Sequence, residues 1–598
     1  MSSAGVNELL EAAVATGVEC DLRDVPDAEV RAEVVRDLLL TGSGARGLRL
    51  RGARLTGRLD LEGRRIGELR LLDCELVEQP WLRGASLPLV DLRRCLLPAG
   101  LSLTETTIER VLLLDHVRAG RWIALDGARL GGACSLRNAR LTCPDGPALV
   151  ADRVRVDGEL RLDDLVAQGT GPQGVLSLVG ARIDGRLSGR RLVATNPAGP
   201  AIVADNLQVT DTIDLSKGSR ITGTGERGAM RIVGARASSL SLGGAELTNP
   251  AGWALAAHYL GLVGTLYLDR MVATGGLRMS GSRIGGQVDL TGSTVDGGAG
   301  SALAGTRLQV SQAVVLDDAV LHSTGERATV DLRSARVAGD VELRRTRLSH
   351  PGGIALRLNT AVVEGRVILD QVAVQQGGVD LRDSTIGTLH DDPATMLPAQ
   401  DGWVELGGLT YRGVPGRLGV TAGERIAWLA RMPQYEAQPY RQLAAAYQAA
   451  GHPDDARRVL VAQQRHLRRS GALTGWSVLR HRLSGVLLQY GYQPFRAVGL
   501  LALTLLAAAV LFLGLAGGTT AGGGAVAAAG PCPAVDRVGL AIDTAVPLAT
   551  TGAAERCALA TGTASGRTLA IAGWALTLLG WASATLVVAG YTGLVRRS

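Results

Sequence analysis

The chain has 598 residues, of which 80 are glycine, and it carries a formal net charge of +7. Its length indicates more than one domain. Hydrophobic residues make up 46% of it, too many for a disordered chain, and the glycines have no three-residue period, which excludes collagen. Only 3% of the residues are aromatic, a composition that suits a narrow core of small and medium side chains.

Residues 1–46 are predicted to form a helical cap. One apolar stripe contains Leu9, Leu10 and Ala13, and a second precedes the break at Gly42 and Gly44. The segment that follows is a repeat whose ends would expose unpaired strand edges. A cap at its start is therefore expected.

Residues 47–412 repeat one pattern: apolar, any, Gly, any, apolar, any, Leu. The clearest copies are Leu55–Leu61, Val156–Leu162, Leu262–Leu268, Ile284–Leu290, Val337–Leu343 and Val363–Leu369. The glycine slot falls at 132, 158, 185, 211 (Asp), 264, 286, 312 (Gln), 339 and 365, in steps of 26, 27, 26, 53, 22, 26, 27 and 26. The step of 53 is interpreted as two turns.

A fixed period with alternating apolar residues is typical of a stacked β-solenoid. The predicted fold class is therefore mainly β, a right-handed parallel β-solenoid with helical segments at both ends and two transmembrane helices. Glycine and aspartate in each unit, as at Gly57 and at Asp184 and Gly185, are interpreted as turn residues that need backbone freedom.

Residues 413–496 are predicted to be a helical connector that ends in a membrane-interface belt. Residues 439–460 resemble one tetratricopeptide helix pair, and a single pair is too short to form a peptide groove. From Arg457 to Arg496 there are eight arginines and no acidic residue. The belt consists of Arg480, Arg482, Tyr490, Tyr492 and Arg496. An apolar segment follows at once, which favours lipid headgroups over nucleic acid as its partner.

Residues 497–598 are predicted to be a two-span membrane domain. The stretches 497–517 and 568–590 carry no charge and are long enough to cross a bilayer. Arginines precede the first span and follow the second, whereas the loop 518–567 has no positive excess. The positive-inside rule then places both termini and the solenoid in the cytoplasm, at the inner face of the cell membrane, where anionic headgroups lie. No N-terminal signal peptide is evident, which agrees.

The external loop holds Cys532 and Cys557, which are predicted to form a disulfide, with two unpaired cysteines as the alternative. The other five cysteines are expected to stay reduced. Between this pair lies an apolar segment too short to span a membrane, interpreted as a re-entrant or interfacial helix. Asp543, Thr544 and Pro547 are its candidate pore-loop residues. Gly573, Gly580 and Ala584 would let the second span approach another helix, within the chain or in a second copy.

No catalytic, cofactor or metal site is predicted. The dinucleotide pattern G-x-G-x-x-G occurs three times, at 42–47, 169–174 and 223–228, but the first follows a helix and the others lie at solenoid corners. Aspartate recurs beside the ladder leucine, at Asp60, Asp91, Asp214, Asp289, Asp331 and Asp380. These aspartates are interpreted as partners of nearby arginines, with an acidic groove that cleaves polysaccharide, as in some β-helix enzymes, as the alternative.

The cap, the Gly-Ala-Arg-Leu turns, the elbow from Tyr490 to Pro494 and the tail from Gly580 to Leu586 resemble a group of actinobacterial proteins. These combine a pentapeptide-like β-solenoid with a two-span membrane tail and are often named membrane-associated oxidoreductases. The resemblance covers nearly the whole chain. It implies a membrane-anchored solenoid, and its name implies redox activity.

Three hypotheses follow. The first is a membrane-tethered scaffold that binds a protein partner or itself. The second is an oligomeric two-span channel regulated by the solenoid, although Thr550, Thr551 and Gly552 continue with Ala553 and Ala554 and so depart from a potassium filter. The third is the oxidoreductase that the resemblance implies.

Overall fold

The computed structural model describes residues 3–25, 28–41, 47–393, 396, 402–414, 420–471, 495–515, 525–527, 530–546, 548–559, 561 and 564–591. The chain divides into two compact units, Met1–Gln442 and Leu443–Ser598. Each unit is described by itself.

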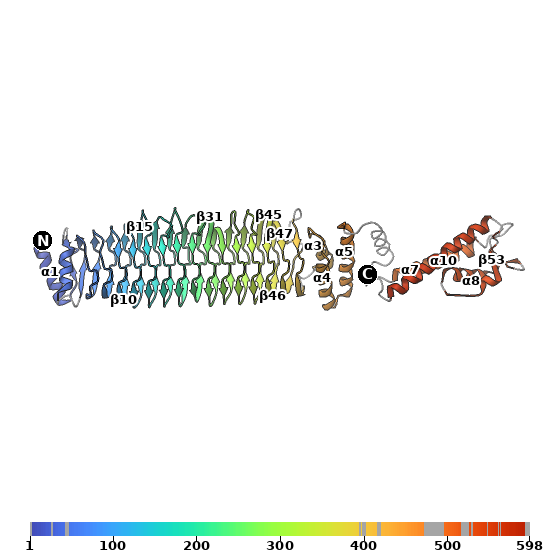
Figure 1. Cartoon of the computed structure of the whole chain (residues 1–598), viewed down its shortest axis with the longest axis horizontal. Coiled ribbons are helices and arrows are strands. Elements are labelled where there is room, and N and C mark those ends of the chain that lie inside the picture. Colours follow the sequence, from blue (N-terminus) through green and yellow to red (C-terminus); the bar gives the residue numbers. More distant parts are fainter. Residues whose placement is uncertain are drawn as a thin grey trace. The chain divides into compact units, whose positions relative to one another are not determined.

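The first unit is a parallel β-solenoid of about 15 turns, which confirms the predicted fold class (Figure 1). Its strands form two large sheets, one of 26 and one of 24 strands. A central turn supplies four short strands: β13 (Arg129–Leu130) and β14 (Cys134–Ser135) to the first sheet, then β15 (Arg140–Cys143) and β16 (Leu149–Val150) to the second.

Strands at equivalent positions in successive turns pair in parallel, so that each forms a ladder along the solenoid. We call the ladder that contains β13 the first face. It continues through β17 (Arg155–Val156), β21 (Arg182–Ile183), β25 (Gln208–Val209), β29 (Arg236–Ala237), β32 (Gly261–Leu262), β35 (Arg283–Ile284), β39 (Gln309–Val310), β43 (Arg336–Val337) and β46 (Val362–Ile368).

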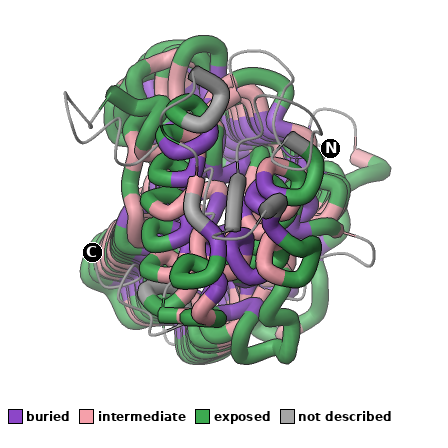
Figure 2. Tube along the Cα trace, turned by 90° about the vertical axis from the view of Figure 1, so that its right-hand side faces the viewer, coloured by how far each residue is buried: buried purple, intermediate pink, exposed green. Residues whose placement is uncertain are grey.

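The core is a set of aliphatic stacks inside the coil. Along a strand, one side chain points out and the next points in, as with exposed Arg182 and buried Ile183 in β21. Because the strands are in register, Val156, Ile183 and Val209 stack on one another in successive turns. Figure 2 shows buried residues in purple within the coil and exposed residues in green around it.

The step of 53 residues in the glycine slot corresponds to two turns. Ser238 occupies the missing position. Its N–H donates to the carbonyl of Asp211 at 3.0 Å, and the N–H of Gly264 donates to the carbonyl of Ser238 at 2.7 Å. The prediction from the period is therefore confirmed, with serine in place of glycine.

The expected reason for glycine holds at Gly57, whose φ is 79°, but a different reason applies at Gly185. Gly185 has no positive φ, so turn freedom does not require it. A Cβ at Gly185 would instead lie 2.8 Å from the carbonyl oxygen of Gly158 in the preceding turn. At Gly185 the main chains of successive turns therefore lie close together. Left-handed backbone occurs at other corners, for example at Asn138 (φ 57°) and Arg153 (φ 55°).

The N-terminal end of the solenoid is covered by α1 (Ser3–Thr16) and α2 (Ala32–Leu40). Between the two helices, β1 (Cys20–Asp21) and β2 (Glu29–Arg31) already pair with β3 (Leu48–Arg51) and β4 (Arg54–Thr56). Strand pairing therefore begins before residue 47, within the segment expected to be helical.

The C-terminal end of the solenoid is closed by α3 (Ala422–Leu429) and the start of α4 (Gln438–Ala449). The last strand of the first sheet is β50 (Thr410–Gly413). The side-chain amides of Gln438 and Gln442 donate to the carbonyls of Leu409 and Tyr411, at 2.8 and 2.6 Å. Helix α4 thus satisfies acceptors at a strand edge that no further turn covers.

Helix α3 is attached to the solenoid by a buried ion pair. The Arg425 guanidinium donates to both carboxylate oxygens of Asp391, at 2.7 and 2.9 Å, and both side chains are almost fully buried. Burial raises the pKa of Asp391, while Arg425 opposes that shift. Loss of one partner would leave a buried charge without compensation, which typically costs about 3–5 kcal/mol.

In the second unit, α5 (Pro453–Arg469) belongs to the expected connector, whose residues 472–494 lie outside the described part. Helix α7 (Phe495–Val510) continues as the π-helix η2 (Leu511–Leu515), and α10 (Ala564–Tyr591) is the second long apolar helix. Between them come β51 (Ala525–Ala527), β52 (Gly530–Pro531), α8 (Ala534–Ala545), α9 (Ala553–Arg556) and β53 (Cys557–Leu559). The three strands form a small antiparallel sheet.

Replacing Gly185 with valine tests the close approach in the slot. The new side chain would force two turns apart, and we expect Gly185→Val to lower the free energy of unfolding by about 1–3 kcal/mol. The matched control is Gln312→Val, because the slot already accommodates a side chain there. Chemical denaturation followed by circular dichroism measures both. Equal loss in the two variants would contradict this account of the slot.

Candidate functional site

The recurring aspartates of the solenoid are mostly engaged by arginines. Asp91, Asp331 and Asp380 pair with the arginine two residues later, at 2.7, 2.9 and 2.9 Å. Asp214 pairs with Arg190 of the preceding turn at 2.7 Å. Neutralised carboxylates of this kind do not form an acidic groove. The two remaining positions differ: Asp289 accepts from the hydroxyl of Thr291, and Asp60 from the N–H of Glu62.

Ion pairs also connect turns on the outside of the coil. Arg191 donates to Asp164 and Arg345 to Asp318, each through two hydrogen bonds of 2.6–2.7 Å. These bonds lower the pKa of both carboxyl groups. Each is an exposed pair, and exposed pairs contribute little to stability.

The two glycine-rich patterns within the described residues lie between strands. Residues 169–174 run from the end of β19 (Val166–Gly169) toward β20 (Leu176–Ser177), and 223–228 separate β27 (Arg220–Thr222) from β28 (Met230–Arg231). Neither pattern opens a helix, whose N-terminus the phosphate would need. Residues 42–46 of the first pattern lie outside the described part. Within that part, no group of three or more His, Cys, Asp or Glu side chains could hold a metal ion.

The most distinctive local structure is the segment between the two long apolar helices. Helix α8 packs against both α7 and α10. Its buried residues Leu540, Ala541 and Ala545 share one apolar cluster with Phe512 of η2 and Leu569 of α10. Gly539 of α8 allows α9 to approach closely, because a Cβ at Gly539 would lie 2.6 Å from the Cβ of Ala553.

The C-terminal end of α8 contacts α10 within the apolar stretch of α10. The stretch Arg567–Val588 is long and apolar enough to cross a membrane, as is Arg496–Gly514. Gly580 lies within it, and a side chain there would collide with the main chain of Ala545. The glycine stripe of α10 therefore serves packing within the chain at this position. Gly573, one step earlier on the stripe, faces the ring of Phe512.

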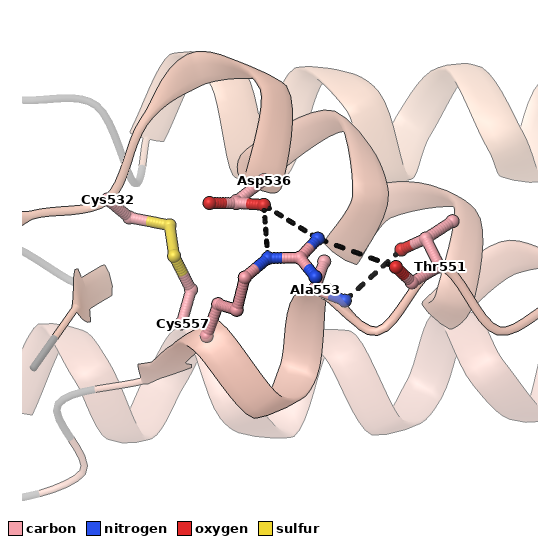
Figure 3. Close-up of a disulfide and its surroundings, with 6 residues drawn as sticks. Cys532, Asp536, Thr551, Ala553 and Cys557 are labelled. Carbon is pink, nitrogen blue, oxygen red and sulfur yellow. Dashed lines mark hydrogen bonds and ion pairs between the residues drawn. A yellow bond between two sulfur atoms is a disulfide. The ribbon is translucent and has the colours of Figure 1, made fainter.

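A disulfide and an ion pair close the neck of the segment (Figure 3). Cys532 and Cys557 are bonded, with their Cα atoms 5.9 Å apart, and both are buried. Beside them, the Arg556 guanidinium donates to Asp536 at 2.9 Å. We call residues 532–557 the hairpin, since the disulfide joins its two ends.

At the other end of the hairpin, Asp543 organises the return of the chain. Its carboxylate accepts from the N–H of Thr551 at 2.7 Å and from the Thr551 hydroxyl at 3.0 Å. The Thr544 hydroxyl donates to the carbonyl of Leu540 within α8, so it supports the helix. Of the three candidate pore-loop residues, Pro547 lies outside the described part.

Of the expected interface belt, only Arg496 is described, and its side chain is exposed at the start of α7. Arg480, Arg482, Tyr490 and Tyr492 lie outside the described residues. The expected contact of these residues with lipid stays a prediction.

Outward faces of α7 and α10 are strongly apolar. Large side chains there are exposed, including Leu503 (60%), Trp574 (70%) and Leu578 (72%). Exposed apolar surface of this kind is unfavourable in water and suits a lipid or protein environment.

Sequence reasoning missed one set of residues, a column of exposed arginines on the first face. The signal was present as an arginine directly before the first apolar residue of several repeats, as at Arg129, Arg182 and Arg336. What the sequence cannot reveal is that these arginines, unlike most others in the solenoid, form no ion pair among the described residues.

Comparisons of the chain with protein-family models, with curated proteins and with solved structures found no match. The function must therefore be argued from the geometry of this chain.

Counting reactive thiols tests the disulfide. The chain has seven cysteines, of which five are free and buried, and burial raises the pKa of Cys134 to about 12. We expect five cysteines to react with a maleimide mass tag in denaturant before reduction, and all seven after it. Seven before reduction would contradict the bond. The variant Cys532→Ser with Cys557→Ser should show five under both conditions.

Proposed function

We propose that the chain is a membrane-anchored scaffold, in which the apolar helices hold the solenoid at the cytoplasmic face of a membrane. The observation that carries the proposal is the pairing of a long, regular solenoid with two helices whose exposed side chains are apolar. A solenoid presents long continuous surfaces for binding rather than a catalytic cleft.

Charge and redox arguments support the orientation. Arginines precede α7, and Arg596 and Arg597 follow α10, whereas the segment between the helices has no positive excess. The disulfide lies in that segment, and disulfides persist in oxidising compartments. The five free cysteines all belong to the solenoid unit, as expected for a reducing cytoplasm.

A channel is the second candidate, favoured by the contact of Ala545 with Gly580. If α10 spans the membrane, the hairpin enters it from one side and turns back part of the way through. Irregular backbone at such depth is tolerated only inside protein or beside water. The polar pair of Asp543 and Thr551 lies at this turn. A ring of several chains would give these groups a wet environment.

Labelling of two engineered cysteines tests the orientation. Val263→Cys lies on the solenoid, where the side chain is 82% exposed, and Thr561→Cys lies in the predicted external loop, also exposed. A membrane-impermeant maleimide should label Thr561→Cys in sealed right-side-out vesicles and Val263→Cys only in inside-out vesicles. The reverse pattern would contradict the orientation. Labelling of both variants in both vesicle types would contradict membrane anchoring.

Oligomeric state and conductance separate the two candidates. The channel requires a closed ring, so the purified protein in detergent should form one defined oligomer and produce currents in planar bilayers. Asp543→Asn should alter those currents, because it removes a charge at the turn of the hairpin. A monomer without current would eliminate the channel and leave the scaffold. The variant Asp536→Asn, at the neck, serves as the control.

A further inference from the structure

One face of the solenoid carries a column of arginines in register. Within the strand ladder of the first face, the outward position is Arg129, Arg155, Arg182, Gln208, Arg236, Gly261, Arg283, Gln309 and Arg336 in nine successive turns. Successive positions are separated by the strand spacing of ~4.8 Å, so the column extends over ~38 Å.

None of these six arginines has an ion-pair or hydrogen-bond partner among the described residues. The contrast with neighbouring columns is sharp. Arg190 and Arg191 belong to the same turn as Arg182. They pair with Asp214 and Asp164, at 2.7 and 2.6 Å. The first-face arginines also lie over no aromatic ring within that part of the chain.

A column of like charges is unfavourable for the stability of the solenoid. Like charges directly opposite one another on adjacent strands destabilise a sheet, and Arg129, Arg155 and Arg182 are stacked in this way. In other columns, aspartates pair with the arginines and offset this repulsion. A stack of like charges without paired carboxylates is expected where a surface has a function.

A groove of about 430 Å³ lies along the middle of the column. Arg182, Arg236 and Arg283 line it together with one carboxylate, Asp184, and its floor includes the small residues Ser238 and Gly261. The exposed Val263 adds an apolar patch at one end. The groove thus combines an open floor, hydroxyl groups and a positive rim.

These features favour an extended acidic peptide over other polyanions. Guanidinium groups bind carboxylates through two parallel hydrogen bonds. The small side chains of the floor leave room for the main chain of a peptide. The apolar patch can contact an apolar side chain of a peptide, whereas a phosphate polymer offers no such group. Single-stranded nucleic acid would need aromatic platforms, and none of the nine outward positions in this ladder is aromatic.

We propose that this arginine column and its groove dock an extended acidic segment of a partner polypeptide. The inference rests on the scaffold function proposed above and specifies the class of partner. An extended chain advances by ~3.3 Å per residue, so a segment of about 12 residues would cover the column. Binding would be salt-dependent, because the contacts are exposed charges.

The test is fluorescence anisotropy with the purified full chain and a labelled glutamate-rich peptide of about 12 residues. A peptide with glutamine for glutamate is the neutral control. The variant Arg182→Gln, Arg236→Gln and Arg283→Gln should weaken binding about tenfold or more, since it removes the three guanidinium groups that line the groove. The matched variant Arg140→Gln, Arg220→Gln and Arg347→Gln removes the same charge from equivalent outward positions of another ladder. It should change binding less than about twofold.

Three results would overturn the proposal: no preference for the acidic peptide, equal loss in the two variants, or stronger binding of polyphosphate or anionic vesicles through the same arginines. The last result would assign the column to a phosphate-bearing partner. Because the measurement needs no membrane, its outcome is independent of the labelling that tests the anchored scaffold.

Discussion

The hydrogen bond between the main chains of successive turns is the interaction on which this structure depends. Each turn satisfies its strands only through the turn before and the turn after, as when the N–H of Gly185 donates to Gly158 at 3.1 Å. This constraint explains the glycine at slot positions such as Gly185, where a side chain would lie against the main chain of the preceding turn. It also explains both ends, because the last turn has no successor and its acceptors must be met by side chains such as Gln438 and Gln442.

In-register stacking also determines what the surface can do. A residue type that recurs at one position of the repeat becomes a stripe along the solenoid, so chemistry here is spread over a face and not gathered in a pocket. Aspartate and arginine stripes neutralise each other over much of the coil. The first face is different because its arginines form no ion pairs among the described residues. A scaffold that recognises a linear charged partner uses this geometry directly.

Much of the fold follows from the sequence, since a period of 22 to 27 residues with fixed apolar positions leaves few alternatives. The doubled step of 53 residues also predicted the turn in which Ser238 takes the place of glycine. Other features depend on neighbours distant in sequence. The pairing of β1 and β2 between two helices has no periodic signal, because each strand is only two or three residues long. The contact of Gly580 with Ala545 could equally have formed between two chains. Which arginines are unpaired depends on the turns above and below them.

The central claim is that the apolar helices anchor the solenoid to a membrane. Its most direct test compares the full chain with a chain that ends at Gly471, before α7, after alkaline extraction of membranes. The account predicts that the full chain remains in the membrane pellet and that the truncated chain is released in soluble form. Release of the full chain by alkali would contradict it, because helices that cross a bilayer are not extracted without detergent.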